Sequence, residues 1–501
     1  MSEKYTQLLK KDYLDYLKDN KIDKNYLNEK YINLYLKIID LFSKTPWTTQ
    51  EEVLKLFEIP DKKILIDLNN IIRSSDSAQK FITKLGVGKK YWNTIIPFAK
   101  TTEKTLSNTY SFPQRIALFP GVSCMFYCGF CGRNQSEKYP SSILKNSKEI
   151  FKILFSQINE NTALSISGGL EPLTNPNIGE IISSAKKNNI KVPLITNGYS
   201  LTENFIKKNP GIWDLDSLRV SLYGVDKSSY NFITRVEKSF EIVKRNTISF
   251  LKLRNEINKN LKFGFNFIII PENVNQLNGI ITLIKDINDN VKNGEGVNFL
   301  TLRDDYQSVT GNSEETDTER KYRLNSKMNI ETRKILIEKL LEFESNKNKF
   351  CPNLYVDYGY SLEALSNNIF DKELVKVTHK NMRKFGFTQM SVAIDLYGDV
   401  FLYREAGFLN RKGNEKFIIG RLDLDNDLEK ILKDFLSSKK PIEHDFQDER
   451  FMDSFDHVLT SLVNQAESDK NLGIPFEYGP VRERAKFNKI NLGNNWYSEN
   501  T

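Results

Sequence analysis

The sequence predicts an α/β fold: a partial barrel of six strand–helix units, with a helical domain before it and an α+β domain after it. From Arg115 onward, short apolar runs alternate with amphipathic segments, which is typical of a parallel sheet with crossover helices. The first 110 residues instead repeat apolar residues at helical spacing. At 501 residues the chain is too long for one ordinary core. We therefore expect domains at 1–110, 111–310 and 311–501.

The N-terminal domain is predicted to be helical because apolar residues recur at i, i+3 and i+4 in four segments. These segments are Tyr13–Leu17, Tyr31–Phe42, Glu51–Phe57 and Lys63–Ile72. The sequence Thr48-Thr49-Gln50-Glu51 resembles the capped start of one of these helices.

The middle domain contains six apolar or β-branched runs that we predict to be strands: Arg115–Pro120, Ala163–Ser167, Lys191–Thr196, Ser217–Tyr223, Lys262–Ile270 and Val297–Leu302. Amphipathic helices are predicted between them at Ser147–Ile158, Asn177–Lys187, Phe240–Lys252 and Gln276–Ile287. Six units, where a closed barrel has eight, indicate a barrel that is open on one side. Its chemistry is expected on the loops at the C-terminal ends of the strands.

The last domain is expected to begin after the polar stretch Thr310–Thr318. The pattern predicts a helix at Ile330–Glu344, a strand at Leu354–Tyr358, a β-hairpin with a glycine turn at Ser391–Leu402 and a helix at Phe451–Ala466. We expect this domain to close over the open barrel and to shape a substrate pocket.

Charge and apolar patterning exclude several classes of protein. The net charge of +8 is the small difference between 72 basic and 64 acidic residues, and no block of like charges suggests a nucleic-acid tail. The N-terminus lacks the apolar core of a signal peptide, and the strongest apolar run, Phe265–Ile270, is too short to span a bilayer. Four cysteines do not make a disulfide scaffold. We expect a soluble cytoplasmic protein that binds neither nucleic acid nor membrane.

Three of the four cysteines, Cys124, Cys128 and Cys131, lie within eight residues directly after the first predicted strand. Thiolates hold iron–sulfur clusters, and three protein ligands would leave one iron of a [4Fe–4S] cluster open. A structural zinc site normally needs four ligands, but Cys351 and the three histidines lie far along the chain. Zinc, a redox CxxC motif and scattered structural cysteines are the alternatives to the cluster.

Polar and glycine residues follow the next three predicted strands. Gly168 and Gly169 would let a ligand approach the backbone, and the carboxylate of Glu171 could accept a hydrogen bond from an ammonium group. Asn197 and Ser221 stand at the ends of the third and fourth strands. Tight turns are the alternative explanation for the glycine pair and for Asn197.

The C-x3-C-x2-C spacing on the loop after the first strand resembles the radical S-adenosylmethionine (SAM) superfamily. The resemblance implies that the open iron binds the amino and carboxylate groups of SAM and that Phe130 contacts its adenine. It also implies that Gly168, Gly169 and Glu171 meet the methionine amino group, although Leu170 interrupts the usual order of that element. Asn197 and Ser221 would contact the ribose and carboxylate of SAM.

Motifs from about Lys90 to Asp469 further resemble radical SAM ammonia-lyases of deoxysugar biosynthesis. The segments that show this resemblance include Tyr91–Thr94, Phe119–Gly121, Ser167–Pro176, Arg303–Tyr306, Asp357–Tyr360, Gly398–Val400, Tyr403–Phe408 and Phe451–Asp453. The chain departs from that family at Gly198-Tyr199 and Asp304, where the family has Ser-Phe and Glu.

This resemblance implies removal of the C3 hydrogen of a nucleotide-linked 4-amino-4,6-dideoxy sugar and elimination of ammonia from C4, giving a 3-keto-4,6-dideoxy sugar. It implies a flavodoxin- or ferredoxin-type electron donor. The alternatives are a radical SAM dehydratase or dehydrogenase acting on an aminoglycoside or another sugar nucleotide, and a metal-bearing binding module without catalysis.

Substrate residues are expected on the later strand ends and in the last domain. The candidates for taking the hydroxyl proton are Asp304, Asp305, Asp357 and Glu405. The candidates for binding substrate are Arg303, Tyr306, Tyr403 and Arg404. Of these, the two arginines are expected to bind the pyrophosphate. We expect no second cluster, because Phe401–Arg404 stand where auxiliary-cluster domains carry cysteines. Cys351 is predicted to be a core residue.

Overall fold

The computed structural model describes residues 3–19, 24–44, 50–75, 77–78, 101–128, 131–133, 136–158, 162–258, 260–270, 272–291, 294–304, 330–358, 378–438, 440–453, 455–456, 459–460, 463–464 and 467. The chain divides into two compact units. The first comprises Met1–Leu106, Tyr358–Lys376 and Ser461–Thr501, and the second comprises Ser107–Asp357 and Val377–Thr460. This division groups residues 377–460 with the barrel, whereas the sequence prediction assigned them to a separate C-terminal domain.

The described part of the first unit is helical. Its helices are α1 (Glu3–Asp19), α2 (Glu29–Lys44), α3 (Gln50–Leu56), α4 (Lys62–Ser74) and α8 (Thr102–Leu106), and the short 3-10 helix η1 spans Lys24–Leu27. Three of the four predicted segments lie within α1, α2 and α4, and the fourth, Glu51–Phe57, ends one residue beyond α3. Tyr13 of α1 packs against Tyr35 of α2, and both are fully buried. The predicted capping residues Thr48 and Thr49 lie outside the described residues.

The second unit is built on six parallel strands that pair in chain order, so the predicted radical SAM-type α/β partial barrel is confirmed. They are β1 (Arg115–Leu118), β2 (Ala163–Ile166), β3 (Pro193–Thr196), β4 (Ser217–Leu222), β5 (Lys262–Ile269) and β6 (Phe299–Asp304). The registers align the C-terminal ends of the strands; Leu118 pairs with Ile166, for example. All loops that follow these strands therefore leave the sheet at one edge.

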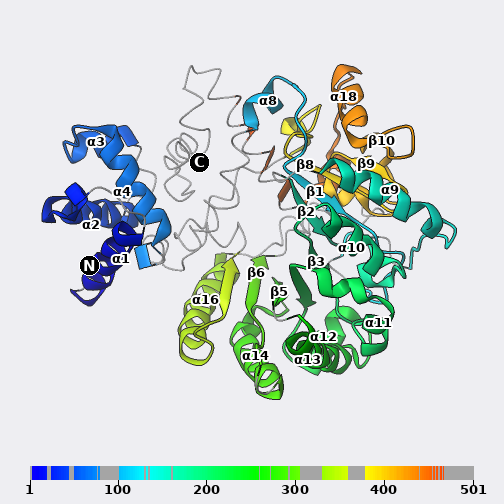
Figure 1. The fold of residues 1–501 in the computed structure, drawn as a ribbon, viewed down its shortest axis with the longest axis horizontal. Coiled ribbons are helices and arrows are strands. Elements are labelled where there is room, and N and C mark those ends of the chain that lie inside the picture. The colour runs from blue at the N-terminus through cyan, green and yellow to red at the C-terminus, as the bar shows by residue number, and fades with distance from the viewer. Residues whose placement is uncertain are drawn as a thin grey trace. The chain divides into compact units, whose positions relative to one another are not determined.

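Crossover helices cover one face of this sheet, as Figure 1 shows in green and cyan. They are α9 (Ile143–Gln157), α10 (Ile178–Lys187), α11 (Glu203–Lys208), α12 (Lys227–Thr234), α13 (Ser239–Ile257) and α14 (Leu277–Val291), with 3-10 helices η2 (Pro172–Thr174), η3 (Pro210–Asp214) and η4 (Val274–Gln276). Their apolar sides are buried; Phe151, Ile182 and Ile284 are fully enclosed. The four helices predicted here are all present.

The later part of the chain extends the sheet at both ends. The strand order is β10-β9-β8-β1-β2-β3-β4-β5-β6-β7. The predicted hairpin forms from β8 (Ser391–Ile394) and β9 (Asp399–Phe401), and β8 also pairs in parallel with β1. The other strands are β7 (Tyr355–Tyr358) and β10 (Ile418–Arg421). The hairpin is thus part of the barrel sheet.

The remaining helices of this part are α16 (Ile330–Phe350), α18 (Leu428–Ser438), η5 (His379–Asn381), η6 (Arg404–Gly407), η7 (Glu415–Phe417) and η8 (Phe446–Phe451). The predicted boundary at Thr310–Thr318 lies outside the described residues, and the predicted helix at Phe451–Ala466 is described only in part. Over the described ranges, no helix is both long enough and apolar enough to cross a membrane.

A buried carboxyl group holds the turn between β8 and β9. Asp395 Oδ1 accepts hydrogen bonds from the backbone N–H groups of Tyr397 (2.9 Å) and Asp399 (3.0 Å), and Oδ2 accepts one from the Tyr139 hydroxyl (2.9 Å). Burial, together with the nearby Asp399, raises the pKa of Asp395 to about 7. The group therefore binds its proton more tightly in the folded protein than in the unfolded chain.

This pKa predicts a pH-dependent cost of folding. Between about pH 4 and pH 7 the folded state holds a proton that the unfolded state has lost, so Asp395 reduces stability as pH rises through this window. Asp395→Asn keeps the acceptor for the turn but removes the titration. Its stability relative to the parent protein should rise by up to about 3 kcal/mol from pH 5 to pH 8, measured from thermal-unfolding midpoints. A difference that is constant over this range would contradict the assignment.

Candidate functional site

The three clustered cysteines lie on the loop that leaves β1 at the C-terminal edge of the sheet. Cys128 is buried, and Cys124 and Cys131 are partly buried. The N–H of Cys131 donates to the carbonyl of Cys128 at 3.1 Å. Burial raises the pKa of all three thiols, that of Cys124 to about 11, and the other two thiols raise the pKa of Cys128 further. The three sulfur atoms therefore lie within electrostatic reach of one another.

The turn after β2 holds this loop by hydrogen bonds. The Thr174 hydroxyl accepts from the backbone N–H of Ser123 (3.1 Å), and the N–H of Glu171 donates to the carbonyl of Ser123 (2.9 Å). The Asn175 side chain donates to the carbonyl of Pro120 at 2.8 Å. The segment that the sequence singled out for its glycines therefore also positions the cysteine loop.

Glycine is needed at Gly121, where the two segments touch. A Cβ atom there would lie 2.6 Å from the carbonyl carbon of Leu170, which is closer than atoms can approach. At Gly168 and Gly169 a Cβ would meet no neighbour closer than 3.4 Å, an ordinary contact. The protein's own packing therefore does not require the glycine pair, and its expected contact with a ligand stays a prediction.

Glu171 joins the ends of β2 and β3. Its carboxylate is buried and accepts hydrogen bonds from the backbone N–H groups of Leu173 (3.0 Å) and Asn197 (2.7 Å) and from the Thr196 hydroxyl. Burial raises the pKa of Glu171, while these three donors lower it. The predicted contact with the amino group of SAM stays a prediction, and the carboxylate's visible role is to fix the end of β3.

Asn197 connects this carboxylate to the cysteine loop. Its side-chain N–H donates to Cys124 Sγ at 3.8 Å and to Met125 Sδ at 3.1 Å, while its backbone is held by Glu171. Three residues predicted as site residues, Cys124, Glu171 and Asn197, thus come together. Ser221, also predicted, is buried at the end of β4, opposite Asn266 of β5.

Arg133 is a residue that sequence reasoning missed. It is 5% exposed, and one guanidinium nitrogen, Nη2, donates to the carbonyl of Phe126. Its Nη1 is buried without a hydrogen-bond partner among the described residues. The positive charge opposes the rise in the pKa of all three cysteines. The signal available in the sequence was that Arg133 is the first charged residue after Arg115.

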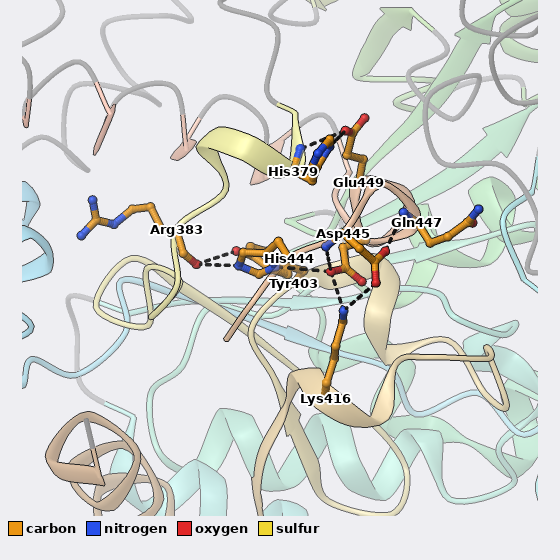
Figure 2. A network of polar contacts seen from close by, with 9 residues as sticks. His379, Arg383, Tyr403, Lys416, His444, Asp445, Gln447 and Glu449 are labelled. Carbon is orange, nitrogen blue, oxygen red and sulfur yellow. Dashed lines mark hydrogen bonds and ion pairs between the residues drawn. The ribbon is translucent and has the colours of Figure 1, made fainter. Parts of the chain in front are cut away.

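Tyr403, a predicted substrate contact, is a core residue in the structure. Its ring is fully buried and packs edge-on against Phe387 and Phe417. Its hydroxyl donates to the carbonyl of Arg383 at 3.2 Å, next to His444, which contacts the same carbonyl (Figure 2). A side chain so enclosed is not placed to meet a substrate, because its polar atom is already paired inside the protein.

The network in Figure 2 anchors the segment that continues from Tyr403. Lys416 pairs with Asp448 at 2.5 Å and with Asp445 at 3.4 Å. His379 Nδ1 lies 2.9 Å from a carboxylate oxygen of Glu449. These contacts bind η5, η7 and η8 to one another, and so fix the backbone on either side of Tyr403.

Arg404 extends from this anchor to the end of β2. Its Nη1 lies 2.5 Å from Asp453 Oδ2, its Nη2 donates to the Ser167 hydroxyl at 3.4 Å, and its backbone N–H donates to Asp456 at 2.8 Å. Burial would raise the pKa of Asp453, but Arg404 and, more weakly, Arg303 hold it below its ordinary value. Arg404 and Arg303, both predicted to bind pyrophosphate, therefore act on the same carboxylate.

The second aspartate of this group, Asp456, differs from Asp453. Burial and the nearby Asp453 raise the pKa of Asp456 well above its usual range. Its Oδ1 is buried and has no hydrogen-bond partner within the described ranges. Sequence reasoning missed Asp456 and assigned no role to Asp453, because neither the separation from Arg404 nor the burial is visible in a local pattern.

Glu405 lies beside the cysteine loop. Its carboxylate is 3.1 Å from Arg411 Nη1, and the pair is buried. A Cβ on Gly132 would lie 3.0 Å from Glu405 Oε2, so the pair rests on the backbone directly after Cys131. Sequence reasoning proposed Glu405 as a proton acceptor for the substrate and did not find Arg411.

The remaining predicted residues are described incompletely. Phe130, Asp305 and Tyr306 lie outside the described residues. Asp304 ends β6 and Asp357 lies in β7, but the structure does not describe their side chains. Arg303 precedes Asp304 and pairs with Ile268 of β5. Their predicted roles stay predictions.

The cysteine loop suits a [4Fe–4S] cluster. Across the described ranges, no group of three His, Cys, Asp or Glu side chains is placed to hold a single metal ion. In a cluster each thiolate binds a different iron, so the ligands are spread more widely than around one ion. Thiols that burial keeps neutral lose their protons when iron binds them. Cys124, Cys128 and Cys131 would hold the cluster, which leaves one iron for SAM.

A parallel partial barrel with a three-cysteine loop after its first strand defines an enzyme that generates radicals from SAM. Residues 118–284 match the model of the radical SAM superfamily. A curated relative is 34% identical over 389 residues, covering 77% of both chains: the dTDP-4-amino-4,6-dideoxy-D-glucose ammonia-lyase of Streptomyces venezuelae. The chain belongs to the radical SAM superfamily, and its cofactors are a [4Fe–4S] cluster and SAM. The relative supports the predicted class of radical SAM ammonia-lyase.

Solved structures with a similar fold are more distant. Streptococcus suis SuiB bound to precursor peptide SuiA is 14% identical, with a TM-score of 0.46 over 86% of this chain and 90% of that chain. The protein anSMEcpe with bound AdoMet is also 14% identical, with a TM-score of 0.41 over 77% of this chain and 90% of that chain.

Removal of one cluster cysteine should abolish the radical chemistry. Cys128→Ala leaves two thiolates, so the anaerobically reconstituted protein should lose most of the roughly four irons expected per chain and form no 5′-deoxyadenosine. Cys351→Ala is the matched control and should keep full iron content, because it lies outside the loop. Appreciable SAM cleavage by Cys128→Ala would contradict the assignment.

Glu171→Gln should weaken SAM binding with little effect on the sugar substrate. The glutamine amide has a donor where the glutamate has a second acceptor oxygen. At least one of the three donors at the ends of β2 and β3 then loses its hydrogen bond. An unsatisfied buried donor costs about 1–3 kcal/mol, which disturbs the strand ends expected to meet SAM. Calorimetric titration with SAM and with the sugar nucleotide would separate the two effects. Loss of sugar affinity with unchanged SAM affinity would contradict this role.

Proposed function

We propose that this enzyme eliminates ammonia from C4 of a nucleotide-linked 4-amino-4,6-dideoxy sugar and forms a 3-keto-4,6-dideoxy sugar. The observation that carries the proposal is the 34% identity to the ammonia-lyase over 389 residues, because it extends well beyond residues 118–284, which any radical SAM enzyme could match. The similarity therefore includes regions outside the part that binds the common cofactors.

The bound cofactors supply a 5′-deoxyadenosyl radical, which removes the C3 hydrogen of the sugar. The C3 hydroxyl then loses its proton and the C4 amine leaves as ammonia. One electron and one proton, or a hydrogen atom, must return to C4, because the net change is the loss of ammonia alone. The protein must hold the amine, accept the hydroxyl proton and exclude water from the site.

The proton acceptor is proposed among the aspartates at the ends of β6 and β7. Asp304 ends β6 and Asp357 lies in β7, and Asp305 follows Asp304 in the sequence. Glu405 was a fourth candidate, but its carboxylate is buried against Arg411 beside the cysteine loop. A carboxylate committed to a buried cation is a weak base, so we do not propose it as the acceptor.

The diphosphate of the substrate is proposed to bind near Arg404. Arg404, Arg115 and Arg303 all stabilise the ionised form of Asp453, and the charge of Asp453 in turn raises the pKa of Asp456. Three guanidinium groups therefore act on this one carboxylate at the end of β2. Guanidinium groups form paired hydrogen bonds with phosphate oxygens, so such a group of arginines suits an anionic substrate.

A radical SAM dehydratase or dehydrogenase that acts on another sugar nucleotide or an aminoglycoside is the second candidate. The observation that favours this second candidate is the sequence at Gly198-Tyr199 and Asp304. These residues are expected near the site, and they depart from the pattern of the ammonia-lyases. A flavodoxin- or ferredoxin-type protein is proposed as the electron donor, since the cluster must be reduced before each radical is formed.

The decisive experiment is turnover of the reconstituted enzyme with SAM, a reductant and the amino sugar nucleotide, followed by mass spectrometry and an ammonia assay. Ammonia and the 3-keto-4,6-dideoxy product in equal amounts are expected. Loss of water, or a product two hydrogens lighter with the amine retained, would overturn the proposal and identify a dehydratase or a dehydrogenase.

Arg404→Ala should weaken binding of the sugar nucleotide by about 1.5–3 kcal/mol, which is roughly 10- to 150-fold in Kd, because it removes charged hydrogen bonds to the diphosphate. SAM cleavage without sugar should change little. Arg421→Ala is the control, because it also breaks an ion pair with an aspartate, between Arg421 of β10 and Asp399 of β9. Normal sugar-nucleotide affinity in Arg404→Ala would exclude the contact.

A further inference from the structure

The segment after β9 brings a buried ion pair to the cysteine loop. Glu405 lies in η6 and Arg411 follows it by six residues. Arg411 Nη1 contacts both the Glu405 carboxylate (3.1 Å) and the Glu405 carbonyl (3.3 Å). The Arg411 side chain is fully buried and that of Glu405 is 6% exposed. The two charges are therefore shielded from water but not from the protein groups around them.

Gly132 is the point where this pair meets the loop. A Cβ atom at this position would lie 3.0 Å from Glu405 Oε2 and 3.2 Å from Arg411 Nη1. The absence of a side chain therefore lets both charged groups approach the backbone next to Cys131. Phe408 and Phe451 lie against the guanidinium of Arg411, with ring centroids at 5.7 and 5.2 Å. They fill the space that water would otherwise occupy.

Charges buried this close to the loop act strongly on it. Burial lowers the pKa of Arg411 to about 10, so the guanidinium stays cationic near neutral pH. Its charge and that of Glu405 act in opposite directions on Cys131, one favouring and the other opposing negative charge. The effective dielectric constant inside a protein is far below that of water, so neither effect is screened as it would be at the surface.

We propose that Glu405 and Arg411 are positioning residues that set the reduction potential of the cluster. Reduction adds one negative charge to the cluster, and nearby charge is one of the factors that determine the potential. Arg411 stabilises the reduced cluster, whereas Glu405 stabilises the oxidised one. The pair thereby balances the potential and links it to the placement of the segment after β9. This inference concerns the cluster alone and does not depend on which sugar is the substrate.

The test compares Glu405→Gln with Arg411→Gln. The midpoint potential of the cluster is measured in the full-length, reconstituted protein by an EPR-monitored redox titration, without SAM or sugar. Glu405→Gln should shift the midpoint to a higher potential and Arg411→Gln to a lower one, while the double variant should lie near the parent protein. Arg421→Gln breaks the ion pair between β10 and Asp399 of β9; it is the matched control and should leave the midpoint unchanged.

Opposite shifts distinguish an electrostatic role from a purely structural one, because loosening of the loop would move both variants in the same direction. Equal midpoints in all variants, or shifts of the same sign, would overturn the proposal. If one variant fails to bind about four irons, the midpoint potential of the other variant is the test. A midpoint that is unchanged, or that shifts in the direction opposite to the expected one, rejects the inference. Arg411→Lys keeps the charge and should retain the parent midpoint; a downward shift in this variant would also reject it.

Discussion

The turn after β2 holds the cysteine loop in place. Ser123 exchanges hydrogen bonds with Glu171 and Thr174, and Gly121 allows the two backbones to touch. The same turn supplies the Glu171 carboxylate that fixes β3 and Asn197. The turn after β2 therefore fixes both the cysteine loop and the end of β3.

Three consecutive residues after β9 serve three different parts of the second unit. Tyr403 points into an aromatic core, Arg404 reaches Ser167 and Asp453, and Glu405 meets Arg411 beside the cysteine loop. A 3-10 helix has three residues per turn, so successive side chains point about 120° apart. Arg404 and Glu405, the first two residues of η6, therefore reach the charged group at the end of β2 and the cysteine loop, while Tyr403 precedes the helix in an extended conformation and points into the core.

The parts of this structure that repeat in sequence were predictable, and the parts that depend on long-range pairing were not. The strands β1–β6 alternate with helices, so Arg115–Leu118 and its five successors could be located within a few residues. The three cysteines revealed the cluster because their spacing is local. Nothing local predicts that Ser391–Ile394 pairs with β1, since any edge strand could have accepted the hairpin.

The side chains show the same division. Tyr403 and Glu405 were predicted as site residues because both lie in the motif Tyr403–Phe408, which resembles that of the ammonia-lyases, but burial decided their contacts. Tyr403 packs with Phe387 and Phe417, and Glu405 pairs with Arg411 six residues away in irregular chain. A helix or strand period relates residues at fixed spacing, and neither period applies in such a loop. Arg133 could have been noticed as an isolated charge beside the motif.

The parallel pairing of β8 with β1 has a consequence for how the chain folds during synthesis. The strands β1–β6 can assemble as they emerge, but the partner of β1 on its other side leaves the ribosome only after residue 391. Until then one edge of the nascent sheet has unpaired backbone groups, which can template association with other chains. A fragment that stops at the end of β6 retains that open edge permanently, whereas the full chain closes it with its own later strand.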